Sequence, residues 1–229
     1  MINRNITDIF FDLDHTLWDF DKNSMLAFNR VFSKHNINIE LVSFIEIYEP
    51  INLKYWKLYR EEKVDKPELR RGRLKDSFKY FDLTFKEDIL DKLAESYIDE
   101  LPLDNHLFDG TKKILNYLTE KYILHIITNG FDEVQHLKLK NSGINKHFST
   151  ITTSEEIGVK KPNPLIFNSA LKKANIQASR SIMIGDSFEA DILGAESVGM
   201  NTLFYNYRND QIPENYTEIR SLHEIRNFL

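Results

Sequence analysis

The sequence predicts an α/β fold, in which a parallel β-sheet lies between layers of helices and an all-helical domain is inserted after the first strand. Along most of the 229 residues, short apolar runs alternate with amphipathic stretches of helical length, which is typical of βαβ units. Residues 18–103 break this alternation, because their apolar side chains follow helical spacing and no strand-like run occurs. We therefore expect a core of residues 1–17 and 104–229 and a helical insert of residues 18–103.

Five short apolar runs are the expected strands of the core, because each is too short for a helix. They are residues 9–11, 123–128, 150–153, 181–184 and 202–205. Helices are expected between them at residues 111–121, 132–141, 164–174 and 189–198. Gly143 and Gly199 follow two of these helices, where a C-cap glycine is expected. Because βαβ crossovers are right-handed, we expect helices on both faces of the sheet.

Local signals mark the expected helices of the insert. Residues 48–59 are rich in aromatic side chains, and Pro50 is expected to interrupt this segment. Pro67 stands where a helix begins. Residues 84–87, Thr-Phe-Lys-Glu, have the pattern of a capping box.

Composition and charge exclude several classes of function. The net charge is −5, so no basic surface indicates a nucleic-acid polymer as partner. The chain has no cysteine, which excludes disulfides, thiolate zinc sites and a cysteine nucleophile. The first residues do not resemble a signal peptide, and no run approaches the ~18 apolar residues of a membrane span. We expect a cytoplasmic protein without a membrane partner, as a monomer or weak homo-oligomer.

Acidic and polar residues directly follow the expected strands. Asp12 and Asp14 follow the first strand, Thr128 and Asn129 the second, and Asp186 the strand at 181–184. The carboxyl ends of parallel strands share one edge, where such folds bind ligands. The three acids converge only if the first strand and the strand at 181–184 are neighbours. Clustered carboxylates require a compensating cation, and an all-oxygen set favours Mg²⁺ over zinc. The alternative is that these are solvated acids in separate turns.

Two further residues are candidates for the same edge. Lys161 precedes Pro162, which favours an extended backbone that could hold the lysine over the strand ends. The alternative is a surface pair with Lys160. Asp191 lies in the first turns of an expected helix, where it either favours the helix dipole or is an outer partner of the site.

These motifs together resemble the signatures of the haloacid dehalogenase-like hydrolase superfamily. Residues 12–16, Asp-Leu-Asp-His-Thr, resemble the first signature, and Thr128-Asn129 the second. Lys161 before Pro162 resembles the third, and residues 185–191, Gly-Asp-Ser-Phe-Glu-Ala-Asp, the fourth. The resemblance covers essentially the whole chain and implies a Rossmann-like three-layer core with a helical cap.

The resemblance also implies roles for these residues. Asp12 would attack phosphorus and carry an aspartyl-phosphate, while Asp14 would protonate the leaving oxygen and then activate water. Mg²⁺ would be held by Asp12, the backbone carbonyl of Asp14 and Asp186, and Asp191 would orient its water shell or the lysine. The implied substrate-binding residues at the phosphoryl group are Thr128, Asn129 and Lys161. A phosphatase is favoured over a dehalogenase, because a halide leaving group needs no proton from a second acid.

A closer resemblance concerns the substrate. Residues 14–20, 55–58 and 71–74 look like the noncanonical pyrimidine 5′-nucleotidases, which implies substrates such as dUMP and dTMP. We expect the cap to close the pocket, with the base contacted by Trp18, Phe20, Trp56 and Arg73. The alternative is that these aromatic rings pack in the interior and the arginine lies on the surface. A phosphatase or phosphomutase acting on small sugar phosphates or phosphoglycolate remains open, as does a non-catalytic phosphate-binding regulatory module.

Overall fold

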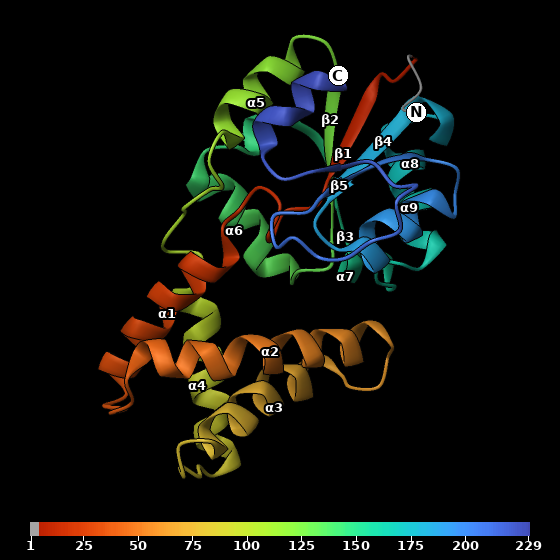
Figure 1. Ribbon diagram of the computed structural model, residues 1–229. Helices are drawn as coiled ribbons and strands as arrows, with labels where there is room; N and C mark the ends of the chain where they lie inside the picture. Colours follow the sequence, from red (N-terminus) through yellow and green to blue (C-terminus); the bar gives the residue numbers. More distant parts are fainter. Residues whose placement is uncertain (1–4) are drawn as a thin grey trace. The chain divides into compact units, whose positions relative to one another are not determined.

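The core of the protein is a six-stranded parallel sheet. The computed structural model describes residues 5–229 (Figure 1), so residues 1–4 of the expected core lie outside the described residues. The strands are β1 (Asp8–Phe11), β2 (Ile123–Thr128), β3 (Phe148–Thr153), β4 (Ser181–Gly185), β5 (Asn201–Tyr205) and β6 (Glu218–Ile219). Their order is β3-β2-β1-β4-β5-β6, and each neighbouring pair is parallel. The predicted α/β fold is confirmed, and β6 was not predicted because two residues carry no periodic signal.

Helices cover both faces of this sheet. In Figure 1, α5 (Thr111–Thr119) and α6 (Asp132–Ser142) lie on one side, and α8 (Pro164–Ala174) and α9 (Gly194–Glu196) on the other. A short helix, α7 (Ser154–Ile157), directly follows β3. Short 3₁₀ turns occur at Asn145–His147, Ala178–Arg180 and Leu222–Asn227. The prediction of an α-helix at 189–198 is wrong in part. Phe188–Leu193 forms a wider π-type turn, and only the short α9 after it is α-helical.

The interior of the core explains why its strands read as short apolar runs. All four residues of β1 are buried, because helices cover both faces of a parallel sheet. Phe10, Ile127 and Met183, from three adjacent strands, pack in one apolar cluster with Phe167 of α8. Gly143 is the C-cap of α6 with a left-handed φ of 73°, as predicted. Gly199 also has a left-handed φ, 84°, but it lies beyond the C-cap of α9, which is Ser197.

The chain divides into two compact units. One contains the residues up to Phe20 together with Asn105–Leu229, and the other is Asp21–Asp104. Four helices span the second unit: α1 (Phe20–Lys34), α2 (Leu41–Arg60), α3 (Lys66–Lys79) and α4 (Glu87–Glu100). Residues 21–104 contain no strand, as the sequence predicts.

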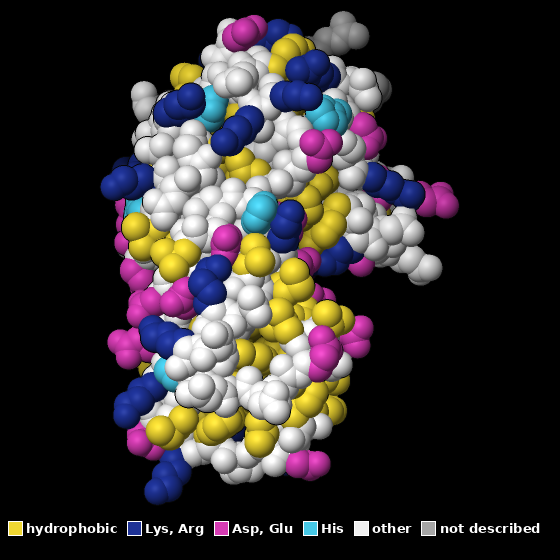
Figure 2. Space-filling view, turned by 90° about the vertical axis from the view of Figure 1, so that its left-hand side faces the viewer, with side chains coloured by type: hydrophobic (Ala, Val, Ile, Leu, Met, Phe, Trp, Pro, Cys, Tyr) yellow, Lys and Arg dark blue, Asp and Glu magenta, His cyan; other side chains and the backbone are white. Residues whose placement is uncertain are grey.

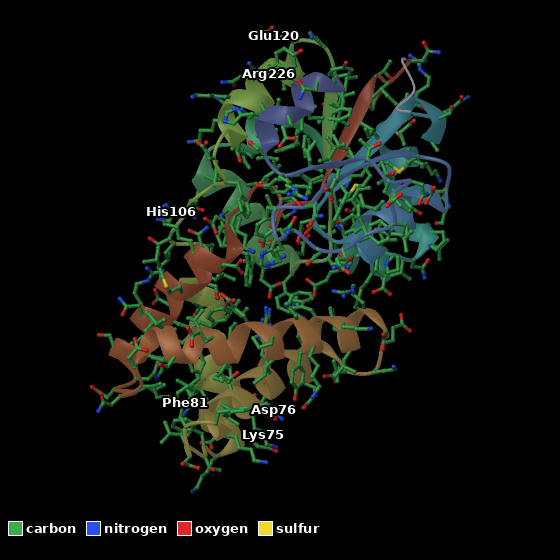
Figure 3. All side chains as sticks on the ribbon, viewed as in Figure 1. Lys75, Asp76, Phe81, His106, Glu120 and Arg226 are labelled. Atoms are coloured by element: carbon green, nitrogen blue, oxygen red, sulfur yellow. The ribbon has the colours of Figure 1, made fainter. Side chains whose placement is uncertain are left out.

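Aromatic packing holds the helical unit together. The ring of Phe28 in α1 lies 5.0 Å from Phe44, 4.6 Å from Tyr48 and 4.3 Å from Tyr97, centre to centre. Tyr55 donates a hydrogen bond of 3.0 Å to Asp76 Oδ2 on α3, the residue labelled in Figure 3. The aromatic segment predicted from the sequence therefore joins α1, α2, α3 and α4.

Two local predictions in this unit are wrong and one is confirmed. Pro50 does not interrupt the aromatic segment, because α2 runs through it. The buried Phe44, Tyr48, Tyr55 and Tyr59 recur at helical spacing, and burial of this face outweighs the roughly 3 kcal/mol that an interior proline costs. The capping box at 84–87 does not form, since α4 has no side-chain cap at Lys86. Pro67 does lie in the first turn of α3.

The surface carries charged side chains of both signs (Figure 2). On the face shown in Figure 2, lysine and arginine side chains are interspersed with aspartate and glutamate. Within residues 5–229, no helix combines the length and the apolarity needed to cross a membrane.

Candidate active site

Three carboxylates meet at the carboxyl ends of β1 and β4. The two strands are neighbours, with Phe11 opposite Ile184, and the Asp12 N–H donates to the Ile184 carbonyl at 3.0 Å. This is the strand order that the sequence argument requires for Asp12 and Asp186 to converge. One carboxylate oxygen each of Asp12, Asp186 and Asp191 lies within 4.8 Å of the others. These three residues are the candidate ligands for a hard cation.

The π-type turn after β4 brings Asp191 into this cluster. Asp191 is fully buried, and its Oδ2 accepts a hydrogen bond of 3.0 Å from the Ser187 N–H. A Cβ on Gly185 would lie 2.2 Å from Asp191 Oδ2, so only glycine at the end of β4 permits this approach. The turn is wider than the predicted α-helix because the Ile192 N–H donates to the Ser187 carbonyl at 3.4 Å, and such π-type turns are frequent at functional sites.

Lys161 contacts two of these carboxylates. Its Nζ donates to Asp12 Oδ1 at 2.7 Å, to Asp191 Oδ1 at 2.6 Å and to the Ile127 carbonyl at 2.8 Å. Its side chain is 2% exposed. The side chain of Asn129 accepts from the Lys161 N–H at 2.8 Å and donates to the Lys161 carbonyl at 3.0 Å. Asn129 therefore fixes the lysine backbone, and its predicted contact with substrate stays a prediction.

The charges at this edge are not balanced by Lys161 alone. Burial raises the pKa of Asp12 to about 7, with Asp191 adding to the rise and Lys161 opposing it. Burial and the neighbouring Asp12 also raise the pKa of Asp186 well above its usual value. Burial opposes the charged form of Lys161, but Asp12 and Asp191 outweigh it and raise its pKa. A buried site of this composition takes up a proton or binds a cation, which fits Mg²⁺.

A second layer of contacts surrounds Asp186. Its Oδ1 accepts from the Thr16 hydroxyl at 3.1 Å, and its Oδ2 accepts from Arg208 at 3.1 Å. Arg208 also lies 2.8 Å from His15 Nδ1, and burial lowers the pKa of His15. His15 has a φ of 63°, a conformation uncommon outside glycine. Arg208 was not predicted, because it lies outside the four signatures and no other pattern in the sequence indicates it.

Thr128 lies at the end of β2 with its hydroxyl proton available. Its Oγ1 accepts hydrogen bonds from the Gly130 N–H at 3.1 Å and from Gln135 Nε2 at 2.6 Å. Because both contacts use oxygen lone pairs, the hydroxyl proton is left to donate to a further acceptor. An anionic oxygen is such an acceptor.

Asp14 lies apart from the three-carboxylate cluster. Its Oδ1 accepts from Lys138 at 2.6 Å and its Oδ2 from Gln135 at 3.0 Å. Its carboxylate is not among the cation-ligand candidates of residues 5–229, and the predicted metal contact of Asp14 concerns its backbone carbonyl. Sequence reasoning missed Lys138 and Gln135. Both lie on the same helix face as the apolar Val134 and Leu139. Polar residues at these buried positions were the sequence signal that could have indicated them.

The four residues predicted for a base pocket belong to different units. Trp18 and Phe20 lie in the core unit; Trp18 is fully buried, with Lys138 Nζ 4.2 Å from its ring centre. Trp56 in α2 is half-buried, 5.8 Å from the ring of Tyr59. Their contact with a base stays a prediction.

Arg73 is buried inside the helical unit, so the alternative of a surface arginine is wrong. Its guanidinium donates to Asn52 Oδ1 at 2.8 Å and lies 5.8 Å and 5.2 Å from the ring centres of Tyr48 and Tyr97. Within residues 5–229, its Nε has no hydrogen-bond partner. A buried guanidinium that uses so few of its donors is costly.

Comparison with known proteins identifies the family. The model of the haloacid dehalogenase-like hydrolases matches residues 9–205. The chain belongs to this family. It is therefore a hydrolase, as the four signatures indicate, and the non-catalytic alternative is not supported.

The chain is similar to several named relatives. It is 32% identical to the pyrimidine 5′-nucleotidase YjjG of Escherichia coli over 225 residues, or 96% of each chain. It is 29% identical to the pyrimidine 5′-nucleotidase PynA of Streptococcus pneumoniae, over 96% of this chain and 91% of that protein. It is 32% identical to a glyceraldehyde 3-phosphate phosphatase of Pyrococcus abyssi, over 87% of this chain and 81% of that protein. A crystal structure of the HAD-hydrolase YfnB of Bacillus subtilis, bound to magnesium, matches with a TM-score of 0.89, 29% identity and 99% coverage of both chains.

Proposed function

We propose that the protein is a Mg²⁺-dependent phosphomonoester hydrolase that acts through an aspartyl-phosphate on Asp12. One observation carries this proposal: a buried lysine bridges Asp12 and Asp191 while Asp186 completes an all-oxygen cluster. Phosphoryl transfer depends on positioning and charge neutralisation, and this edge supplies a carboxylate nucleophile beside the ammonium of Lys161. The magnesium bound to the similar YfnB structure supports a magnesium site in this chain, and Asp12 and Asp186 are its proposed ligands.

Each residue has a role that its contacts support. Asp12 attacks phosphorus, and the free hydroxyl proton of Thr128 binds a phosphoryl oxygen. The three donors of Lys161 are taken by Asp12, Asp191 and the Ile127 carbonyl, so the lysine supplies positive charge beside the nucleophile and binds a phosphoryl oxygen only by exchanging one of these bonds. Mg²⁺, when bound, supplies positive charge opposite the developing charge of the phosphoryl group. Asp14 gives a proton to the leaving oxygen and takes one from the water that hydrolyses the intermediate. Asp191 holds Lys161 in place.

We further propose that the substrates are pyrimidine nucleoside 5′-monophosphates. The two nucleotidase relatives cover 96% of this chain, against 87% for the glyceraldehyde 3-phosphate phosphatase. The unused donors of Arg73, beside the amide of Asn52, suit the carbonyl oxygens of a pyrimidine. The half-buried Trp56 offers an aromatic face, and stacking on such a face is worth ~1–3 kcal/mol per base in single-stranded nucleic acids.

A substrate panel in the presence and absence of a chelator tests both proposals. Phosphate release should cease in EDTA and return with Mg²⁺; undiminished turnover after thorough chelation would refute the metal assignment. In kcat/KM, dUMP or dTMP should exceed phosphoglycolate, glucose 6-phosphate and glyceraldehyde 3-phosphate. Glyceraldehyde 3-phosphate at the head of the ranking would favour the second candidate, a sugar-phosphate phosphatase, which the Pyrococcus relative supports.

A further inference from the structure

Two buried polar side chains of α6, outside the four signatures, hold both oxygens of Asp14. Lys138 Nζ donates to Oδ1 at 2.6 Å, and Gln135 Nε2 donates to Oδ2 at 3.0 Å. Lys138 is 2% exposed and Gln135 is fully buried. The two residues are three positions apart on one face of the helix, so their side chains project to the same place.

The burial of Lys138 points to a role beyond packing. Removing an ammonium group from water is costly unless it is paired, and an apolar side chain beside Val134 and Leu139 would avoid that cost. The ammonium lies 4.2 Å from the ring centre of Trp18 and 5.3 Å from that of Phe20, within cation–π range. These rings restrict where the ammonium can lie, and it contacts the Asp14 carboxylate there.

Gln135 connects the same carboxylate to the phosphate-binding hydroxyl. Its Nε2 donates to Thr128 Oγ1 at 2.6 Å as well as to Asp14 Oδ2. A Cβ on Gly130 would lie 2.2 Å from this nitrogen, so the glycine after Thr128 and Asn129 permits the approach. One amide therefore sets the position of Asp14 relative to Thr128.

We propose that Lys138 and Gln135 are positioning residues that hold the Asp14 carboxyl group in the orientation needed for its two proton transfers. The inference rests on the proposed acid–base role of Asp14. In the first step the Asp14 carboxylic acid gives its proton to the ester oxygen as the P–O bond breaks and Asp12 gains the phosphoryl group. In the second, the Asp14 carboxylate takes a proton from the water that attacks the same phosphorus, while the bond between the Asp12 oxygen and phosphorus breaks and inorganic phosphate leaves.

The geometry is compatible with both transfers. Each carboxyl oxygen has two lone pairs. Each oxygen can therefore accept a hydrogen bond from α6 with one lone pair and hold the transferred proton with the other. Without these donors the carboxyl group is free to rotate, and a misplaced acid loses much of the about 10²- to 10⁴-fold that general acid–base catalysis contributes. Lys138 and Gln135 thus act through Asp14 and need not touch the substrate.

The leaving group provides a readout that a merely structural role would not change. Lys138→Met removes the ammonium at similar volume, and the exposed Lys140 on the same helix gives the matched control Lys140→Met. Single turnovers are measured with two esters: phenyl phosphate, which releases the poor leaving group phenol, and p-nitrophenyl phosphate, which releases the good leaving group p-nitrophenol. We expect Lys138→Met to slow the release of phenol by about 10²-fold. The release of p-nitrophenol should slow by a factor at least ten times smaller, and KM should stay unchanged for both esters. Gln135→Leu tests the same geometry if Lys138→Met does not fold.

A double mutant separates this inference from the proposed function. Because Lys138 acts through Asp14, adding Lys138→Met to Asp14→Asn should cause no further loss. Equal losses on both esters, a raised KM, or an additive loss in the double mutant would overturn the inference and indicate that Lys138 binds phosphate directly. If Asp14→Asn alone retained wild-type turnover, the proposed function would fail instead.

Discussion

Replacing Lys161 with methionine should destabilise the core unit in a manner that depends on pH. The change removes three hydrogen bonds, to Asp12, Asp191 and the Ile127 carbonyl, all between 2.6 and 2.8 Å. Breaking a buried ion pair by removing one partner costs about 3–5 kcal/mol. In EDTA at pH 8 we expect a loss of this size in the free energy of unfolding.

The loss should shrink as the pH falls. Burial already raises the pKa of Asp12 to about 7, and Lys161 opposes this rise, so the methionine variant raises the pKa further. An acid whose pKa is higher in the folded than in the unfolded state contributes stability at low pH, which is lost as pH rises through the folded value. The deficit should therefore be smaller at pH 5, where Asp12 is protonated, than at pH 8.

Urea denaturation of wild type, Lys161→Met and the neighbouring control Lys160→Met, at pH 5 and 8, measures this dependence. Lys160→Met should stay close to wild type at both values. Excess Mg²⁺ should recover more stability in Lys161→Met than in wild type, because it compensates the uncovered carboxylates. A deficit below about 1 kcal/mol at pH 8, or a larger deficit at pH 5 than at pH 8, would refute this account of the lysine.

Three further predictions follow from the same contacts. Asp14→Asn should lose roughly 10³-fold or more in kcat yet retain binding of a phosphate analogue in calorimetry, whereas loss of binding would assign Asp14 to the phosphate site. The dissociation constant for Mg²⁺, from calorimetry, should fall as pH rises towards about 7, because the raised pKa of Asp12 means that binding displaces a proton; a pH-independent constant would contradict this. Burial lowers the pKa of His125 despite its hydrogen bond to Asp8. Below about pH 6.5 the imidazole of His125 therefore binds a proton more readily in the unfolded chain, and the free energy of unfolding decreases as the pH falls. His125→Gln should flatten the unfolding free energy against pH in that range, and an unchanged slope would exclude His125 as its source.

The sequence predicted the parts of the fold that leave a periodic signal. The runs at 123–128 and 164–174 became β2 and α8 with those bounds, since an apolar run and a proline-started amphipathic stretch are local properties. The continuation of α2 through Pro50 was not predictable in this way, because it depends on packing of Phe44, Tyr48 and Tyr55 in the interior of the helical unit. The π-type turn at 188–193 was likewise not predictable, because the residues of this segment also fit an α-helix.

The candidate site, like the fold, could be predicted from the sequence only in part. The convergence of Asp12 and Asp186 could be deduced conditionally, because residues at the ends of neighbouring parallel strands must meet. Lys138, by contrast, is distant in sequence from Asp14, and only the tertiary structure brings its ammonium to 2.6 Å from that carboxylate. In the sequence, this contact was indicated only by polar residues at the same helical spacing as Val134 and Leu139.

The central claim is that Asp12 carries the phosphoryl group during turnover. Wild-type protein with Mg²⁺ and substrate is quenched in acid during the first turnover, reduced with borohydride, digested and sequenced by mass spectrometry. Reduction converts an aspartyl-phosphate to homoserine, and we expect homoserine at residue 12 in the reacted sample and aspartate there in a sample without substrate. Homoserine at Asp14, Asp186 or Asp191, or its absence from residue 12 in a sample quenched during rapid turnover, would contradict the account.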